Sequence, residues 1–241
     1  MKIREVDTSV ADQISAKVFF DSVRGLWDIS EWKVLDAFAR NGQLTVSNYG
    51  MDVGELHLWE LSDQHKHDLQ LIAAKRGKKK TSIHFGCSYE HVARLRADGA
   101  IDFHKYDMVV IDTPQGIHHD WLGIEQTEHF GFLNFELPWL LKDESFVVLY
   151  VNKKPYNAKE LGSHGYDEYE EYDYDKWMRN RSSFYGARVV DEGQAISTYA
   201  RLFGHYGFDV NQVVVTPCFS DVQGLAPYSF RLGLSLRKRV K

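Results

Sequence analysis

The sequence predicts an α/β domain built on a mostly parallel β-sheet with helices on both faces. Three observations favour this fold class. Segments with helical and strand patterns alternate five times along the chain. The strand segments are continuous apolar runs, which is typical of strands buried on both faces. Finally, two strand segments near the end follow one another without a helix, which indicates an antiparallel closing hairpin. A chain of 241 residues can bury a sizeable core, so residues 1–241 are expected to form a single domain.

The expected elements follow in order along the chain. A first helix is predicted over 10–26, with apolar residues at helical spacing at Val10, Ile14, Val18 and Leu26. Ser62 is a candidate cap for the helix after the second strand, and glycines end two later helices. The seven strands are expected at 34–38, 54–62, 79–88, 106–116, 144–155, 210–219 and 228–239. The other helices are expected from Ser62 to about Lys75, and over 89–99, 130–141 and 192–208.

One segment interrupts this alternation, an insertion at about 156–190. Its part from 163 to 181 carries six acidic residues and four tyrosines. Two interpretations stay open, a solvated insertion and a lid or substrate wall.

Composition and charge narrow the class of protein. A net charge of −5 argues against a protein that binds polyanions over its whole surface. The basic run at 75–80 joins a helix to the start of a strand, so we expect it as a solvated loop at the edge opposite the carboxyl ends of the strands. Cys87 and Cys218 are interpreted as reduced thiols. The first residues lack a signal-peptide core, and no apolar run approaches the ~20 residues of a membrane span. The sequence thus predicts a cytoplasmic protein without a membrane segment.

Candidate site residues follow from the topology. In a parallel α/β sheet, ligands bind outside the carboxyl ends of the strands. The side chains expected there are Asp36, Glu60, Cys87, Ser88, the run Asp112 to Gln115, and Asn152 to Lys154.

Four segments carry a resemblance to a known family. VLDAFARNG (34–42) is an apolar run followed by an acid and a glycine turn, LWEL (58–61) ends on an acidic strand end, YDMVVIDTPQG (106–116) ends on Asp112, and SFRLGLSLRKR (229–239) is a terminal strand. In this order they resemble the motifs of class I S-adenosylmethionine-dependent methyltransferases, over about residues 10–239. The resemblance implies a Rossmann-like three-layer sandwich with a seven-stranded sheet.

The resemblance also implies roles for individual residues. S-adenosylmethionine is the expected cofactor, and Glu60 is expected to accept its ribose hydroxyls. Asp36 is expected to hold the turn or the cofactor's amino group. A glycine turn lets the backbone approach a ligand closely. The full cofactor-binding set is Asp36, Phe38, Ala39, Asn41, Gly42, Glu60, Leu61, Cys87, Ser88 and Asp112.

The expected catalytic residues are Asp112, Pro114, Gln115 and Lys153. Asp112 would position the acceptor and take its proton, and Lys153 would contact a phosphate or activate a hydroxyl. The acceptor is expected to be a nucleic acid or a nucleotide-like molecule, because Lys153, Lys154, Arg179 and Arg181 fall near the open edge. A small-molecule acceptor stays open.

Two departures from the family keep other functions open. Arg40 stands at the first glycine of the usual motif. Asp112 is followed by Thr-Pro-Gln, without the aromatic residue on which base-flipping enzymes stack a base. An aminopropyl transferase on the same fold is one alternative, since the acidic, tyrosine-rich insertion would suit a polyamine. A non-catalytic binding protein is another. A nicotinamide enzyme is disfavoured because no GxGxxG follows the first strand.

One group of residues has the side-chain types of a metal site. Their spacing matches no standard cluster, so no metal is expected. These residues are His118, His119, Asp120 and His129.

Overall fold

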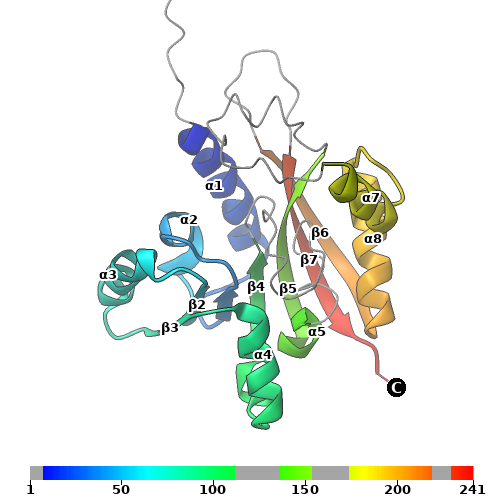
Figure 1. Ribbon diagram of the computed structural model, residues 1–241. Coiled ribbons are helices and arrows are strands. Elements are labelled where there is room, and N and C mark those ends of the chain that lie inside the picture. Colours follow the sequence, from blue (N-terminus) through cyan, green and yellow to red (C-terminus); the bar gives the residue numbers. More distant parts are fainter. Residues whose placement is uncertain (1–7, 112–135, 154–173, 219–228, 241) are drawn as a thin grey trace, which may run out of the picture.

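The computed structural model describes residues 8–111, 136–153, 174–218 and 229–240 (Figure 1). Seven strands form one sheet in the order β3-β2-β1-β4-β5-β7-β6. Their bounds are β1 Lys33–Asp36, β2 Glu55–Glu60, β3 Lys80–Phe85, β4 Tyr106–Ile111, β5 Leu141–Asn152, β6 Phe208–Cys218 and β7 Ser229–Lys238.

The sheet is parallel from β3 to β5 and antiparallel at its other end. β7 runs antiparallel between β5 and β6. In the all-parallel dinucleotide fold the order is 3-2-1-4-5-6, so the reversed β7 distinguishes this sheet from that class. The predicted seven-stranded, mostly parallel sheet with an antiparallel end is confirmed.

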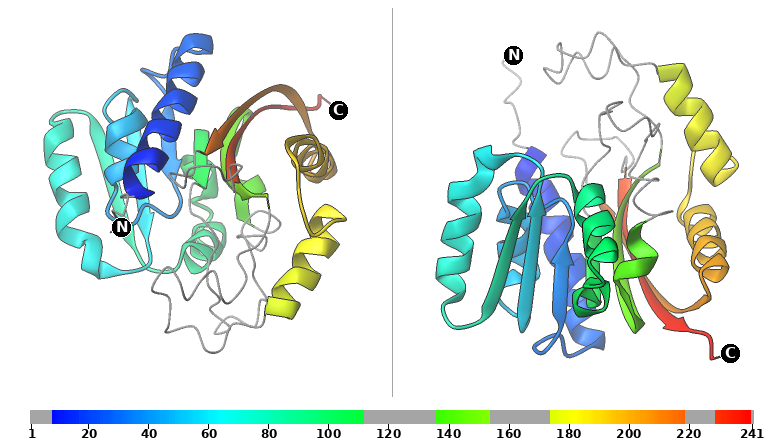
Figure 2. Two further views of the ribbon diagram at one scale, coloured as in Figure 1. Left: turned by 90° about the horizontal axis from the view of Figure 1, so that it is seen from above. Right: turned by 60° about the horizontal axis from the view of Figure 1, so that its bottom comes forward.

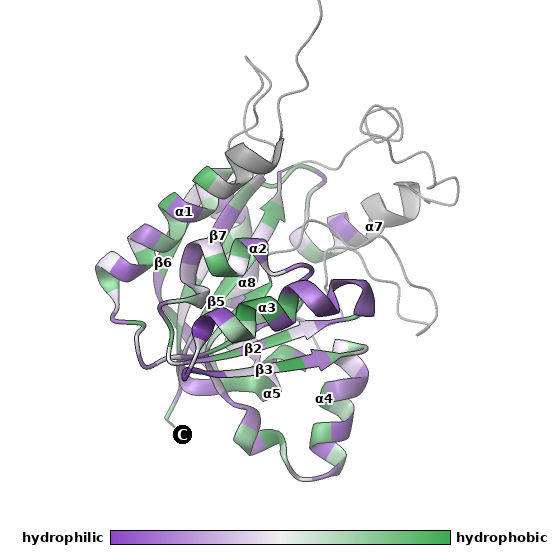
Figure 3. Cartoon of the chain, turned by 90° about the vertical axis from the view of Figure 1, so that its left-hand side faces the viewer, coloured by the Kyte–Doolittle hydropathy of each residue, from purple (hydrophilic) through white to green (hydrophobic). Residues whose placement is uncertain are grey.

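Helices cover both faces and complete three layers (Figure 2). α1 and α3 pack on one face, and α4, α5, α7 and α8 pack on the other. The bounds are α1 Thr8–Leu26, α2 Gln43–Thr45, α3 Lys66–Arg76, α4 Ser88–Ala97, α5 Leu137–Leu140, α7 Tyr174–Tyr185 and α8 Glu192–His205. In Figure 3, α1 and α4 alternate between hydrophilic and hydrophobic residues, as expected for helices with one face on a sheet.

The first helix forms as predicted, but its buried face is not the predicted one. Ile14, Val18 and Leu26 are each about half exposed. The face on the sheet is instead an i, i+3, i+4, i+7 stripe with Phe19 and Phe20 at its centre. The complete stripe is Ala16, Phe19, Phe20 and Val23. Two bulky aromatic rings bury more apolar area than the aliphatic set, and so they decide the rotation of the helix.

Of the helix predicted over 130–141, the described part of the chain contains the single turn of α5. Pro138 lies in its first turn, where a missing N–H costs nothing. Leu141, predicted as helical, already belongs to β5, which begins three residues before its predicted start. Residues 130–135 lie outside the described part of the chain.

The insertion at 156–190 contributes to the core at its later end. α7 lies within this range, and Arg181, Tyr185 and Val190 are buried. The Tyr185 hydroxyl is hydrogen-bonded to the Tyr199 hydroxyl of α8 at 2.8 Å. Deleting 163–181 would therefore remove a buried side chain, that of Arg181. For this residue, the interpretation as a solvated insertion is wrong.

The structure also describes the two cysteines and the length and polarity of the helices. Cys87 and Cys218 are both buried and are not joined in a disulfide. Over the described ranges, the helices are too short or too polar to cross a lipid bilayer.

Candidate functional site

The carboxyl ends of neighbouring strands are tied together by backbone hydrogen bonds beyond the regular ladder. The Ala37 N–H donates to the Val110 carbonyl at 3.0 Å, and the Ala39 N–H donates to the Trp59 carbonyl at 2.9 Å. The Gly86 N–H donates to the Glu60 carbonyl at 2.9 Å. The residues after β1, β2 and β3 thus form one continuous edge, where the predicted cofactor residues lie.

Asp36 ends β1, and its buried carboxylate is bonded to side chains of the segment that follows this strand. Its Oδ2 accepts hydrogen bonds from the Thr45 hydroxyl and from the Tyr49 hydroxyl, the latter at 2.9 Å. Tyr49 belongs to a π-helical turn at Val46–Gly50 that the sequence did not predict. Of the two roles open for Asp36, this geometry supports the holding of the turn, because a buried carboxylate bonded to two hydroxyls fixes the loop that follows.

Glu60 ends β2 with a buried carboxylate held by backbone amides. The Arg40 N–H donates to Oε2 at 2.6 Å, and the Ser62 N–H donates to Oε1 at 2.9 Å. A carboxylate has about four acceptor positions, so two amides orient this group and leave acceptor capacity on both oxygens. That is the geometry required to receive a pair of vicinal hydroxyls.

Gly42 is required by packing against α3 as well as by its backbone conformation. Its φ is +69°, and a Cβ placed there would lie 2.3 Å from Ile72 Cδ1 and 2.9 Å from Leu69 Cδ2. A side chain at this position would displace the ends of the Ile72 and Leu69 side chains. The glycine of the first motif therefore lets the loop close onto α3, a role that the sequence pattern did not reveal.

Arg40 occupies the left-handed region with φ 52°. It is the first central residue of a turn in which the Gly42 N–H donates to the Ala39 carbonyl at 2.8 Å, a position with positive φ that favours glycine. The left-handed conformation costs a non-glycine residue about 1 kcal/mol or more. The side chain is exposed, so it does not fill the core beneath the loop.

The remaining cofactor candidates divide into packed and open side chains. Ser88 is buried and its hydroxyl donates to the Ala37 carbonyl at 3.0 Å. Cys87 is a buried thiol that precedes α4. Phe38 packs on the hydrophobic core of the α4 face. In contrast, Asn41 and Leu61 are exposed. Asn41 Oδ1 accepts the Gln43 N–H at 3.1 Å, and Leu61, 49% exposed directly after Glu60, offers an apolar contact at the edge.

Two cations expected at the open edge are engaged in the fold. Lys153 Nζ lies 2.6 Å from Glu192 Oε1, and this ammonium lowers the pKa of Glu192. The pair ties the end of β5 to the start of α8, so a catalytic role for Lys153 would require it to open. Arg181 is fully buried and donates to the carbonyls of Arg188 and Lys153. The prediction that Arg181 meets nucleic acid is therefore wrong.

Other predicted residues lie outside the described part of the chain. They comprise the catalytic candidates Asp112, Pro114 and Gln115, the cation Lys154, the histidines and the aspartate at 118–129, and the acidic stretch at 163–173. Their roles stay predictions.

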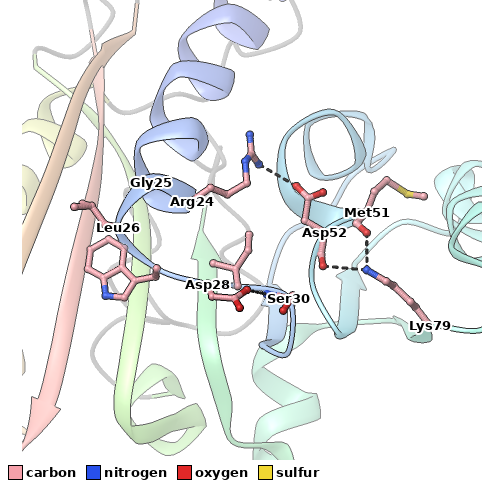
Figure 4. Close-up of a pocket in the computed structure, with 10 residues that line it drawn as sticks. Arg24, Gly25, Leu26, Asp28, Ser30, Met51, Asp52 and Lys79 are labelled. Carbon is pink, nitrogen blue, oxygen red and sulfur yellow. Dashed lines mark hydrogen bonds and ion pairs between the residues drawn. The ribbon is translucent and has the colours of Figure 1, made fainter.

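A depression of about 600 Å³ lies away from this edge (Figure 4). Its residues come from the end of α1 and from the segments that precede β1, β2 and β3, so it belongs to the opposite edge of the sheet. Arg24 is bonded to Asp52, and Lys79 Nζ donates to the Met51 and Asp52 carbonyls at 2.9 and 3.0 Å. Its cations are thus already in use. Lys79 also places the basic run 75–80 at this edge, as predicted. The run is not solvated throughout, because Arg76, the last residue of α3, is buried and donates to the Val53 and Gly54 carbonyls.

A cluster of buried polar rings, unexpected from the sequence, lies on the α4 face of the sheet. His57 Nε2 lies 2.6 Å from Glu55 Oε1, and His57 Nδ1 lies 3.1 Å from the Tyr106 hydroxyl. Burial lowers the pKa of His57 to about 4 and raises that of Tyr106. His57 is therefore neutral near pH 7 and donates to Glu55. Strand alternation that brings His57 to the same face as Trp59 is the signal that could have located it.

Two further histidines extend this cluster toward the carboxyl edge. The His84 and His91 rings stack with centroids 3.6 Å apart, and the Trp59 ring meets His91 edge-on at 4.7 Å. Burial lowers the pKa of both histidines, that of His91 to about 4. Over the described ranges, no group of three metal-ligating side chains is assembled here or elsewhere.

The sheet order and the tied strand ends define a class of fold, and comparison with known proteins agrees. Neither a protein-family model nor a curated protein matches the sequence. Among solved structures, the chain is similar to the TYW2 protein of M. jannaschii in complex with AdoMet, at 12% identity and a TM-score of 0.52, over 99% of this chain and 80% of that one.

Two further structures show the same fold. Magnesium protoporphyrin IX methyltransferase of Synechocystis PCC 6803 with bound SAH is 15% identical, with a TM-score of 0.53, over 99% of this chain and 90% of that one. A Pyrococcus horikoshii protein proposed to be an RNA methyltransferase is 13% identical, with a TM-score of 0.52, over 94% and 84%. The chain therefore has the fold of the class I S-adenosylmethionine-dependent methyltransferases, and the predicted resemblance is confirmed at the level of the fold.

Proposed function

We propose that the protein is an S-adenosylmethionine-dependent methyltransferase. The observation that carries the proposal is the burial and hydrogen bonding of the Glu60 carboxylate. Its carboxylate is buried at the end of β2, oriented by the amides of Arg40 and Ser62, and still able to accept hydrogen bonds on both oxygens. A buried charge of this kind is costly to maintain for structure alone. Two structures of this fold hold AdoMet or SAH, which supports a nucleoside ligand here.

The described residues fit this cofactor in their chemistry. Glu60 accepts the ribose hydroxyls, and the exposed Leu61 contacts the apolar face of the base. Asp36 and Gly42 act indirectly, since they fix the loop between β1 and α3 through Tyr49 and the close approach to Ile72. When bound, the cofactor supplies the electrophilic methyl group.

The protein's contribution to transfer is alignment of the acceptor. Asp112 directly follows β4, which pairs with β1 next to the cofactor residues. We assign to Asp112 the positioning of the acceptor and the uptake of its proton, with the backbone around Pro114 and Gln115 as further contacts. Lys153 is excluded from this set unless its pair with Glu192 opens.

For the acceptor we propose a nucleic acid or a nucleotide. The support is the shared fold with the Pyrococcus horikoshii protein proposed to methylate RNA. Because Arg181 is buried, it does not belong to the exposed cations that favour a nucleic acid, so the acceptor needs a direct test. Tritium-labelled S-adenosylmethionine, incubated with the protein and either total RNA or a small-molecule extract, should label the RNA. Label in the small-molecule fraction alone would replace this acceptor with a metabolite.

The cofactor proposal has a simpler test. Titration calorimetry with S-adenosylhomocysteine should show binding at micromolar concentration. The absence of binding would refute the enzyme. Binding without methyl transfer to any acceptor fraction would favour the non-catalytic alternative.

A further inference from the structure

Arg40 is the one described residue other than glycine with a left-handed backbone. Glycine would occupy this position in the Ala39–Gly42 turn without strain and would keep the amide that Glu60 accepts. The chain instead carries a long charged side chain here, although it is exposed and does not pack in the core. Since glycine would form the same turn and the same backbone hydrogen bond, the strain that arginine adds is explained neither by the backbone nor by a core contact, and it indicates a function for the side chain.

The guanidinium of Arg40 is available for a ligand. Among the described residues no hydrogen bond or ion pair engages it, and only its backbone N–H is used. The neighbouring acids Asp36 and Glu60 are both buried. The exposed charge of this loop is therefore positive, although the carboxylates beneath it are negative.

We infer that Arg40 binds the carboxylate at the amino-acid end of the cofactor and thereby selects S-adenosylmethionine over its decarboxylated relative. This inference rests on the proposed function. Arg40 donates its amide to Glu60 Oε2 at 2.6 Å, so a nucleoside held by Glu60 lies within the reach of the Arg40 side chain. The planar guanidinium matches a carboxylate with two parallel hydrogen bonds.

Selection follows from attraction of one ligand and repulsion of the other. S-adenosylmethionine carries one anionic group, its carboxylate. The decarboxylated molecule keeps the sulfonium and the amine, so it presents only positive charge to Arg40 and is disfavoured. The same residue thus separates methyl transfer from aminopropyl transfer, which uses the decarboxylated cofactor.

The test compares both cofactors on wild type and three variants by calorimetry. Wild type should bind S-adenosylmethionine at least tenfold more tightly than the decarboxylated form. Arg40→Gly retains the amide and relieves the strain, so it should melt no lower than wild type. It should lose at least tenfold in affinity for S-adenosylmethionine and bind the decarboxylated form unchanged or better. Arg40→Lys should retain part of the preference. Arg201→Ala, which removes an exposed cation from α8, is the control and should match wild type.

Several results would overturn the inference. Unchanged affinities for both cofactors in Arg40→Gly would show that the cation serves another group, and a parallel loss of RNA binding would identify that group as an acceptor phosphate. Equal weakening of both cofactors would reduce Arg40 to a determinant of loop shape. These outcomes leave the proposed function intact. Failure of wild type to bind either cofactor would instead remove both proposals.

Discussion

Replacement of Glu60 by alanine should reduce stability and cofactor affinity together. The two amide hydrogen bonds to its carboxylate are charge-assisted and contribute about 1.5–3 kcal/mol each. Alanine also removes a buried charge, whose desolvation opposes folding, and water can reach the freed amides because Arg40 is exposed. The lower end of the range therefore applies, and we expect a loss of about 3 kcal/mol in the free energy of unfolding.

This loss has a measurable size in both assays. For a chain of this length, 1 kcal/mol shifts the melting temperature by about 2–4 °C, so Glu60→Ala should melt roughly 6–12 °C lower. Loss of the ribose contacts should weaken S-adenosylhomocysteine by about 1.5–3 kcal/mol, or roughly 10- to 100-fold in Kd. Differential scanning calorimetry and titration calorimetry below the melting range measure the two effects separately. Glu90→Ala is the matched control, because Glu90 is an exposed acid in the first turn of α4.

The predicted loss of stability and the predicted loss of cofactor affinity can be refuted separately. A variant that melts like wild type would show that the amide hydrogen bonds do not hold the Arg40 turn. A destabilised variant that still binds S-adenosylhomocysteine normally would reduce Glu60 to a clamp between two loops, and the ribose assignment would be lost.

Three further predictions follow from single residues. Gly42→Ala should destabilise by about 2 kcal/mol in urea unfolding, because the added Cβ displaces the ends of the Ile72 and Leu69 side chains in addition to the backbone strain. Gly99→Ala, at a similar φ of +67° with open space around it, should cost only the backbone strain; equal losses would contradict the contact with Ile72. Burial lowers the pKa of His57 to about 4, below its unfolded value of 6.5, so the unfolded chain binds the extra proton between these values. The contribution of neutral His57 to the free energy of unfolding is complete above pH 6.5 and is lost as the pH falls to 4, by up to about 3 kcal/mol. A His57→Gln protein whose free energy of unfolding has the same pH dependence as wild type would refute this prediction. Asp112→Asn should lower turnover at least tenfold, about 1.4 kcal/mol on the barrier, with an unchanged melting temperature; full activity, or activity that follows the folded fraction, would exclude Asp112 from catalysis.

The architecture could be predicted from the sequence because it depends on local patterns. Continuous apolar runs identify strands buried on both faces, and their order with the closing hairpin indicates the sheet. Acids at strand ends, such as Asp36 and Glu60, were located for the same reason, since a strand end is visible in a single stretch of residues. The rotation of α1 was not predicted, because it depends on which side chains fill the space above the sheet, and Phe19 and Phe20 do so.

The roles of the site residues were decided by tertiary contacts. The sequence by itself places Asp36, Arg40 and Gly42 in one loop, but only the fold shows what each of them meets. Asp36 meets a hydroxyl from the π-helical turn, and Gly42 meets α3. The amide of Arg40 meets a carboxylate twenty residues away, in the neighbouring strand. Side-chain hydrogen bonds and close packing act between residues that the chain brings together only after folding, so no pattern along the sequence encodes them.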